Sequence, residues 1–223
     1  MKPWTLIDKT STPDGEPMTL SERDGEYVIR VKGMELMSTR HYQSEERLAE
    51  VVFEKLKNKC PRVLIGGLGF GFTLKAAMRA LPTIRLIVVA ELLEAVIKWN
   101  SDPSYGLCFE ELENPKVTVL HADVKDVLKK YPGGFDAILL DVDNGPSAFT
   151  VKDNNQLYDD HGLQQVLKCL KRDGIAAFWS SNKDPDFMRR LEATGMEHSV
   201  HACHAWGKRG PVHQIYLLNN STR

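Results

Sequence analysis

The sequence has neither an excess of one charge nor a long hydrophobic stretch. Its 223 residues carry 29 basic and 30 acidic side chains, a formal net charge of −1. No basic field therefore favours nucleic acid or an anionic membrane as a partner. No apolar run approaches the roughly 18 residues that a membrane-spanning helix needs. We expect no nucleic acid and no membrane among the partners of this protein.

Paired cysteines are also lacking. The four cysteines lie far apart in the chain and form no CxxC motif: Cys60, Cys108, Cys169 and Cys203. This pattern indicates reduced thiols and a cytoplasmic protein. The histidines His198, His201 and His204 do not predict a metal site, because residues three apart on a strand face opposite sides. We expect no metal ion.

The first 43 residues are interpreted as a small β element. Asp24-Gly25 is a strong hairpin signal between two segments with strand character, and residues 34–39 could add a third short strand. Residues 10–17 are rich in Ser, Thr, Pro and Gly, which predicts a loop before the first of these strands. Residues 44–223 are assigned to a second, larger unit.

This second unit shows alternating strand and helix patterns. A helix is expected from Ser44, and the helix over 162–174 is expected to end at Gly174. Strands are expected at 62–65, 84–92, 116–123, 135–143 and 175–181, and a closing hairpin at 198–206 and 212–220. Repeated β-α units predict an α/β fold with a doubly wound, mostly parallel sheet. The terminal antiparallel hairpin favours the class I methyltransferase-like Rossmann fold.

A glycine-rich loop follows the first strand of this unit. Gly67, Gly69 and Gly71 form G-x-G-x-G, whereas the dinucleotide fingerprint needs a glycine where Phe72 stands. Glycines let the backbone approach a ligand closely. The loop therefore favours a nucleoside-type ligand over NAD, with a tight turn that binds nothing as the alternative.

Acidic residues stand where three later strands end. Glu91 can accept hydrogen bonds from both ribose hydroxyls, and Asp123 can accept one from the exocyclic amine of adenine or cap the next helix. Asp141 ends the strand in "LLDVDNGP". Because open α/β sheets bind ligands at the carboxyl ends of their strands, we expect these acids to meet at one small-molecule site.

These motifs together resemble the spermidine/spermine synthase (aminopropyltransferase) family. The similar segments are "RVLIGGLGFG", "VVAELLEAVIKW", "HAD", "FDAILLDVDNGP" and "SEERLAE". The resemblance implies S-adenosylmethionine or its decarboxylated form as donor, an amine acceptor and a homodimer. It places Glu91 on the ribose, Asp123 near the adenine, and Asp141 and Asp143 at the amine. Phe70 replaces the family's loop aspartate, so the sequence does not decide whether the donor is decarboxylated.

The hypothesis is a spermidine synthase-like transferase with Asp141 as amine acceptor or base and Asp143 assisting. Transfer from a sulfonium needs an aligned nucleophile that has lost a proton. Glu45 and Glu46 are candidates for substrate binding, or they simply favour the N-terminus of their helix. The segment around Asp143 is alternatively an ordinary turn. Two other functions stay open: a small-molecule methyltransferase on the same fold, and a nucleoside-binding regulator without catalysis.

Overall fold

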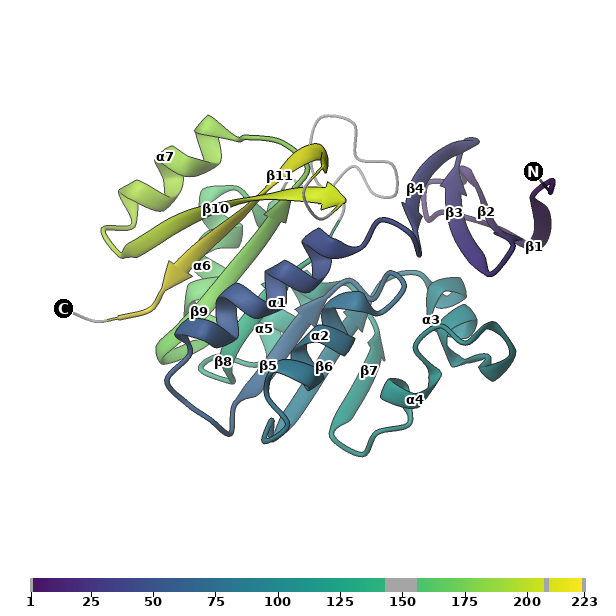
Figure 1. The fold of residues 1–223 in the computed structure, drawn as a ribbon. Coiled ribbons are helices and arrows are strands. Elements are labelled where there is room, and N and C mark those ends of the chain that lie inside the picture. The colour runs from purple at the N-terminus through teal and green to yellow at the C-terminus, as the bar shows by residue number, and fades with distance from the viewer. Residues whose placement is uncertain (1, 143–155, 207–208, 222–223) are drawn as a thin grey trace.

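The structure is a computed structural model that describes residues 2–142, 156–206 and 209–221. It contains two sheets, of which the smaller is built from the N-terminal segment (Figure 1). Its four antiparallel strands follow chain order: β1 (Thr5–Ser11), β2 (Pro17–Arg23), β3 (Glu26–Val31) and β4 (Met34–Ser38). Asp24 and Gly25 turn the chain between β2 and β3 with φ of 53° and 82°, so the expected hairpin is confirmed.

The first strand of this sheet was not expected from the sequence. Residues 10–17 were interpreted as a loop, but β1 continues to Ser11, which pairs with Pro17 at the start of β2. Most side chains of β1 are exposed, because it is an edge strand. An exposed edge strand shows no alternation of apolar and polar residues, and that alternation is the signal from which strands are predicted.

The larger sheet has seven strands in the order β10-β11-β9-β8-β5-β6-β7. Strands β5 to β9 run parallel, and β11 and β10 are antiparallel at one edge. The expected doubly wound sheet with a terminal antiparallel hairpin is therefore confirmed. The strands are β5 (Arg62–Gly66), β6 (Leu86–Glu91), β7 (Val117–His121), β8 (Phe135–Leu140), β9 (Leu170–Ser180), β10 (Glu197–Trp206) and β11 (Arg209–Asn219).

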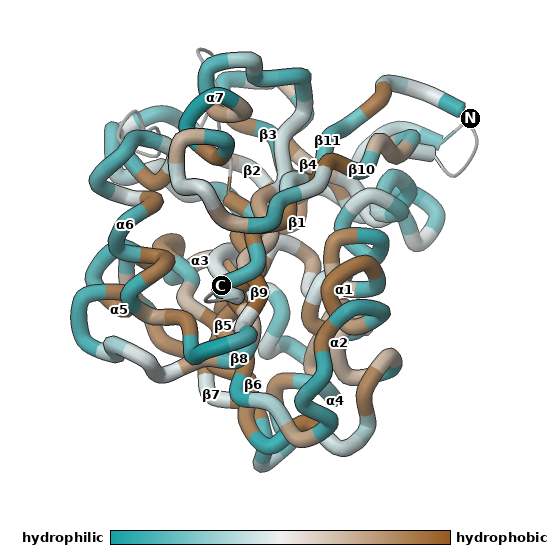
Figure 2. The backbone as a smooth tube through the Cα atoms, turned by 90° about the vertical axis from the view of Figure 1, so that its left-hand side faces the viewer, coloured by the Kyte–Doolittle hydropathy of each residue, from teal (hydrophilic) through white to brown (hydrophobic). Residues whose placement is uncertain are grey.

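Helices cover both faces of this sheet. The helices are α1 (Gln43–Lys55), α2 (Phe72–Ala80), α3 (Glu94–Ser101), α4 (Phe109–Leu112), α5 (Val124–Lys130), α6 (Asp160–Cys169) and α7 (Pro185–Ala193), with a short 3-10 helix at Pro103–Tyr105. One hydrophobic core joins the sheet to α1, α2 and α3, and a second joins it to α5, α6 and α7. Strands β5 and β8 are mostly hydrophobic, whereas α1 carries both hydrophobic and hydrophilic residues (Figure 2).

Helix α6 is shorter than its apolar stripe predicted. The helix was expected to end at Gly174, but it ends at Cys169, and β9 begins at Leu170. Leu170 is buried and pairs with Phe135 of β8, and the register shifts before Ile175 pairs with Ala137. A buried apolar residue at this position fits the apolar face of a helix and a buried strand equally well. The hydrophobic pattern therefore does not show where the helix ends and the strand begins.

The small sheet shares a core with the helices that precede and follow the glycine loop. Met18, Leu20, Ile29 and Val31 of β2 and β3 belong to the same hydrophobic cluster as the buried side chains of α1 and α2. This packing places the small sheet beside the carboxyl ends of the parallel strands. Each of the four cysteines is free. In the ranges that the structure describes, no helix is long and apolar enough to cross a membrane.

Candidate active site

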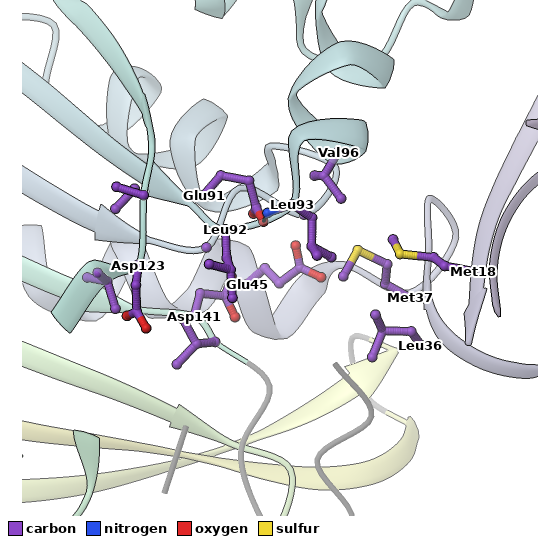
Figure 3. A pocket seen from close by; sticks show the side chains of 16 residues that line it. Met18, Leu36, Met37, Glu45, Glu91, Leu92, Leu93, Val96, Asp123 and Asp141 are labelled. Carbon is purple, nitrogen blue, oxygen red and sulfur yellow. Dashed lines mark hydrogen bonds between the residues drawn. The ribbon is translucent and has the colours of Figure 1, made fainter. Parts of the chain in front are cut away.

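A pocket lies at the carboxyl ends of the parallel strands, against the small N-terminal sheet (Figure 3). It contains about 800 Å³ of space, part of which is open to solvent. Residues 45–142 supply the acidic side chains and the glycine loop, and the small sheet supplies Met18, Leu36 and Met37. In Figure 3 Met18, Leu36 and Met37 lie on one side of the pocket, and the acidic side chains lie on the other side together with apolar residues such as Leu92 and Leu93.

The glycine loop lines the pocket with backbone rather than side chains. Gly67, Gly69 and Gly71 have φ of 91°, 53° and 79°, the left-handed region that favours glycine. A Cβ on Gly67 would overlap the carbonyl oxygen of Asp141, whereas a Cβ on Gly69 would find Met37 Sδ at 3.4 Å as its nearest neighbour. Gly67 and Gly69 line the pocket, and Gly71 is the N-cap residue of α2.

Glu91 closes β6 and lies in the floor of the pocket. Its side chain is buried, with 7% exposure, and its two oxygens accept hydrogen bonds from the backbone N–H groups of Leu68 (2.8 Å) and Leu93 (2.7 Å). Burial raises the pKa of Glu91, and backbone hydrogen bonds oppose that rise. Because a carboxylate has about four acceptor sites, Glu91 can accept further hydrogen bonds from a ligand.

Asp123 lines the pocket and also caps α5. Its Oδ1 accepts a hydrogen bond from the backbone N–H of Lys125 (2.8 Å), and its Oδ2 lies 3.4 Å from the Lys125 ammonium. The capping role that the sequence offered as an alternative is therefore present. The two roles are compatible, because the side chain still lines the pocket.

Asp141 lies directly after β8, whose last residue is Leu140, and faces the pocket. Its Oδ2 accepts a hydrogen bond from the hydroxyl of Thr73 in α2, at 2.7 Å. Burial raises the pKa of Asp141 to about 6, although the Thr73 hydrogen bond lowers it. Asp143, the second candidate for the amine site, lies outside the described residues.

The two candidate acids at the start of α1 have different surroundings. Glu45 lines the pocket beside Asp141, and burial, then the charges of Asp141 and Glu46, raise its pKa well above the ordinary value. Glu46 pairs with Arg79 of α2 at 2.8 Å and is not among the described residues that line the pocket. The structure therefore brings Glu45 together with Asp141, Glu91 and Asp123, and Glu46 lies beside this group.

The lining of the pocket is strongly one-sided in charge. Within the described part of the chain, it contains four carboxyl side chains, from Glu45, Glu91, Asp123 and Asp141, and no Lys, Arg or His side chain. Such a pocket favours a cationic ligand and disfavours an anionic one. In the same described ranges, no three His, Cys, Asp or Glu side chains are grouped so that they could hold a metal ion.

Several residues of the site were missed by sequence reasoning. Met18, Leu36 and Met37 come from the small sheet, and the sequence does not show which domain face that sheet covers. Thr73 was missed as well, although its place in the first turn after the glycine loop was a usable signal. Phe70, which the sequence motif matched to the family's loop aspartate, is buried in the core with 2% exposure.

The fold defines an α/β protein with a class I methyltransferase-like sheet and an acidic pocket at the carboxyl ends of its parallel strands. Residues 42–192 match the family model described as "Spermine/spermidine synthase domain". The chain therefore belongs to the spermine/spermidine synthase family, as expected from its motifs. No curated protein matches the chain.

Two solved structures have the same fold. A spermidine synthase in complex with the transition state analogue AdoDATO is similar with a TM-score of 0.79 and 19% identity. The spermidine synthase of Thermotoga maritima is similar with a TM-score of 0.76 and 18% identity. In both cases the alignment covers 98% of this chain and 74% of the other. The expected fold class is therefore confirmed.

Proposed function

We propose that this protein is an aminopropyltransferase that moves the aminopropyl group of decarboxylated S-adenosylmethionine to an amine. The observation that carries the proposal is the charge of the pocket: four carboxyl side chains and no cationic side chain among the described lining residues, in a member of the spermine/spermidine synthase family. The similar spermidine synthase that was solved with a transition state analogue supports the same assignment.

The charge of the pocket also favours one form of the donor. S-adenosylmethionine carries a carboxylate, which would enter a pocket lined by carboxyl groups without a described cationic side chain to pair with it. The decarboxylated donor carries only positive charges, on its sulfonium and its ammonium. Because like charges at short distance in a buried site repel strongly, the decarboxylated form fits this pocket better.

The parts of the pocket match the parts of such a donor. The backbone of Gly67 and Gly69 leaves room for the nucleoside, and the free acceptor sites of Glu91 suit two ribose hydroxyls. Asp123 suits the exocyclic amine of adenine. The apolar side chains of Met18 and Met37 face the acids and suit the aliphatic part of donor or acceptor.

The transfer itself is an in-line displacement. The nitrogen lone pair of the acceptor attacks the carbon next to sulfur, the carbon–sulfur bond breaks, and its electrons leave with the sulfur as a neutral thioether. The nitrogen must give up a proton, and we assign its acceptance to Asp141, which faces the pocket. With a pKa of about 6, Asp141 is mostly ionised at neutral pH and can act as a base. Glu45 offers a second acceptor to the N–H groups of the same amine, and we assign Asp143 an assisting role.

The free cysteines support a cytoplasmic location, and membership of the family supports a homodimer. Sedimentation would measure the oligomeric state.

Calorimetry with decarboxylated S-adenosylmethionine, S-adenosylmethionine, methylthioadenosine and NAD tests the donor. Mass spectrometry of a panel of amines tests the transfer. We expect tightest binding of the decarboxylated donor and an aminopropylated product.

Other results of this experiment would replace the proposal. Preference for S-adenosylmethionine with a methylated product would indicate a methyltransferase. Binding of adenosyl compounds without transfer to any amine would indicate a nucleoside-binding regulator.

A further inference from the structure

Thr73 lies behind the acids of the pocket and is not one of its described lining residues. It is the second residue of α2, and its side chain is buried with 2% exposure. Its Oγ1 lies 2.7 Å from Asp141 Oδ2 and 3.3 Å from the backbone carbonyl oxygen of Glu45. A hydroxyl has one proton to donate, and the shorter distance favours Asp141 as its acceptor.

The charged side chains that line the pocket with Asp141 are acidic, and Lys125 pairs with one of them, Asp123, at 3.4 Å. Glu45 faces Asp141 from α1, and Glu91 and Asp123 line the same pocket from the end of β6 and the start of α5. Glu46 adds negative charge near Glu45, although Arg79 pairs with it. None of the described lining residues is Lys, Arg or His.

Glu45 and Asp141 are neighbouring carboxyl groups, each half-buried in the wall of the pocket. Two such groups do not both ionise readily, so a proton shared by the pair is favoured. A hydrogen bond donated to one carboxyl stabilises the ionised form of that carboxyl over the other. We propose that Thr73 is a positioning residue that keeps Asp141 ionised and oriented as the base, and so leaves the shared proton on Glu45. The link to catalysis rests on the proposed function, whereas the hydrogen bond and the proton distribution do not.

The pKa directions agree with this geometry. The Thr73 hydrogen bond lowers the pKa of Asp141, whereas the charge of Asp141 raises the pKa of Glu45. In Thr73→Val the hydroxyl is lost and the shape of the side chain is kept. In Thr73→Ser the hydroxyl is kept and a methyl group is lost, which makes this variant the matched control.

The test is a pH titration of the ligand-free protein by NMR, with ¹³C at the side-chain carboxyl carbons of Asp and Glu. Asp141→Asn and Glu45→Gln identify the two signals. We expect Thr73→Val to raise the titration midpoint of Asp141 by about one pH unit, and to lower that of Glu45, because a hydrogen bond to the charged form is lost. Thr73→Ser should titrate as the wild type does. If Thr73→Val does not fold, Thr73→Ala provides the same comparison.

The outcome that would overturn the proposal is an unchanged midpoint of Asp141 in a folded Thr73→Val variant. A shift of equal size in Thr73→Ser would overturn it as well. The titration needs neither donor nor acceptor, so it decides the role of Thr73 even if no aminopropyl transfer is found.

If transfer is found, the acidic limb of the pH profile of kcat/KM should move upward in Thr73→Val by the same shift, with recovery at higher pH. A loss that is equal at every pH would indicate a structural role and would also overturn the proposal.

Discussion

The Glu91→Gln substitution tests the assignment of the nucleoside site most directly. Glutamine keeps the size of the side chain but has one acceptor oxygen, whereas Glu91 uses both oxygens on backbone N–H groups, at 2.8 Å from Leu68 and 2.7 Å from Leu93. One of these N–H groups will face the amide NH₂ of the glutamine. The remaining oxygen has too few acceptor sites to serve a backbone N–H and two ribose hydroxyls equally well.

The expected loss follows from the charge of the hydrogen bonds. Hydrogen bonds to a charged group contribute about 1.5–3 kcal/mol. Losing this contribution makes the dissociation constant of the ligand roughly 10- to 150-fold larger. Methylthioadenosine is the suitable ligand, because it has the ribose hydroxyls and lacks the positive charges that would respond to Glu91 at a distance. Calorimetry at neutral pH measures the dissociation constants of wild type and variant.

The matched control is Glu94→Gln, on the helix that follows Glu91. Glu94 is an exposed acid that forms an ion pair with Lys98 at 3.1 Å. Its replacement by glutamine changes the net charge by the same amount as Glu91→Gln and leaves the floor of the pocket unchanged. We expect it to bind methylthioadenosine as the wild type does. Unchanged affinity in a folded Glu91→Gln variant, checked by thermal unfolding, would refute the ribose assignment.

The remaining predictions concern the two acids at the reaction site. Asp141→Asn should still bind the donor, more weakly than wild type because one carboxylate of the cationic site is lost, and lower turnover by roughly 10²–10⁴-fold, the usual cost of losing a general base; intact turnover measured by mass spectrometry would contradict it. Because burial raises the pKa of Asp141 to about 6, the native state binds this proton more tightly than the unfolded state. Asp141 therefore costs stability as pH rises from about 4 through 6, so the Asn variant should unfold at a higher temperature than wild type at pH 7, with a smaller difference at pH 4. Glu45→Gln should raise KM for the amine, whereas the neighbouring Glu46→Gln should leave it unchanged; equal effects would show that Glu45 has no special place at the site.

The sequence predicted much of the site because several site residues lie at strand ends, and the fold determines where the strand ends lie. In a parallel sheet the carboxyl ends of the strands meet at one edge, so Glu91, Asp123 and Asp141 could be placed together from the strand pattern alone. The glycine loop was recognisable for the same reason, because its position after the first strand fixes its place at this edge. These inferences needed chain order and strand direction but no side-chain packing.

The features that depend on packing were not predictable in this way. Glu45 and Glu46 are adjacent in the sequence, and successive residues of a helix point about 100° apart. The rotation of α1 decides which of them enters the pocket, and that rotation is set by the burial of Leu48, Val51 and Val52 against the sheet. The apolar wall depends likewise on where the small sheet packs, which no local pattern encodes.

The raised pKa values of three acids in the pocket have a consequence for ligand binding. Burial raises the pKa of Glu45, Glu91 and Asp141, so ionisation of these groups is less favourable in the pocket than in water. A cationic donor stabilises the ionised forms, and its binding therefore releases protons, whereas methylthioadenosine is uncharged and releases few. Calorimetry in two buffers of different ionisation enthalpy measures this release. The affinity for the decarboxylated donor should rise with pH through the region around 6, and a pH-independent affinity would contradict the cationic site.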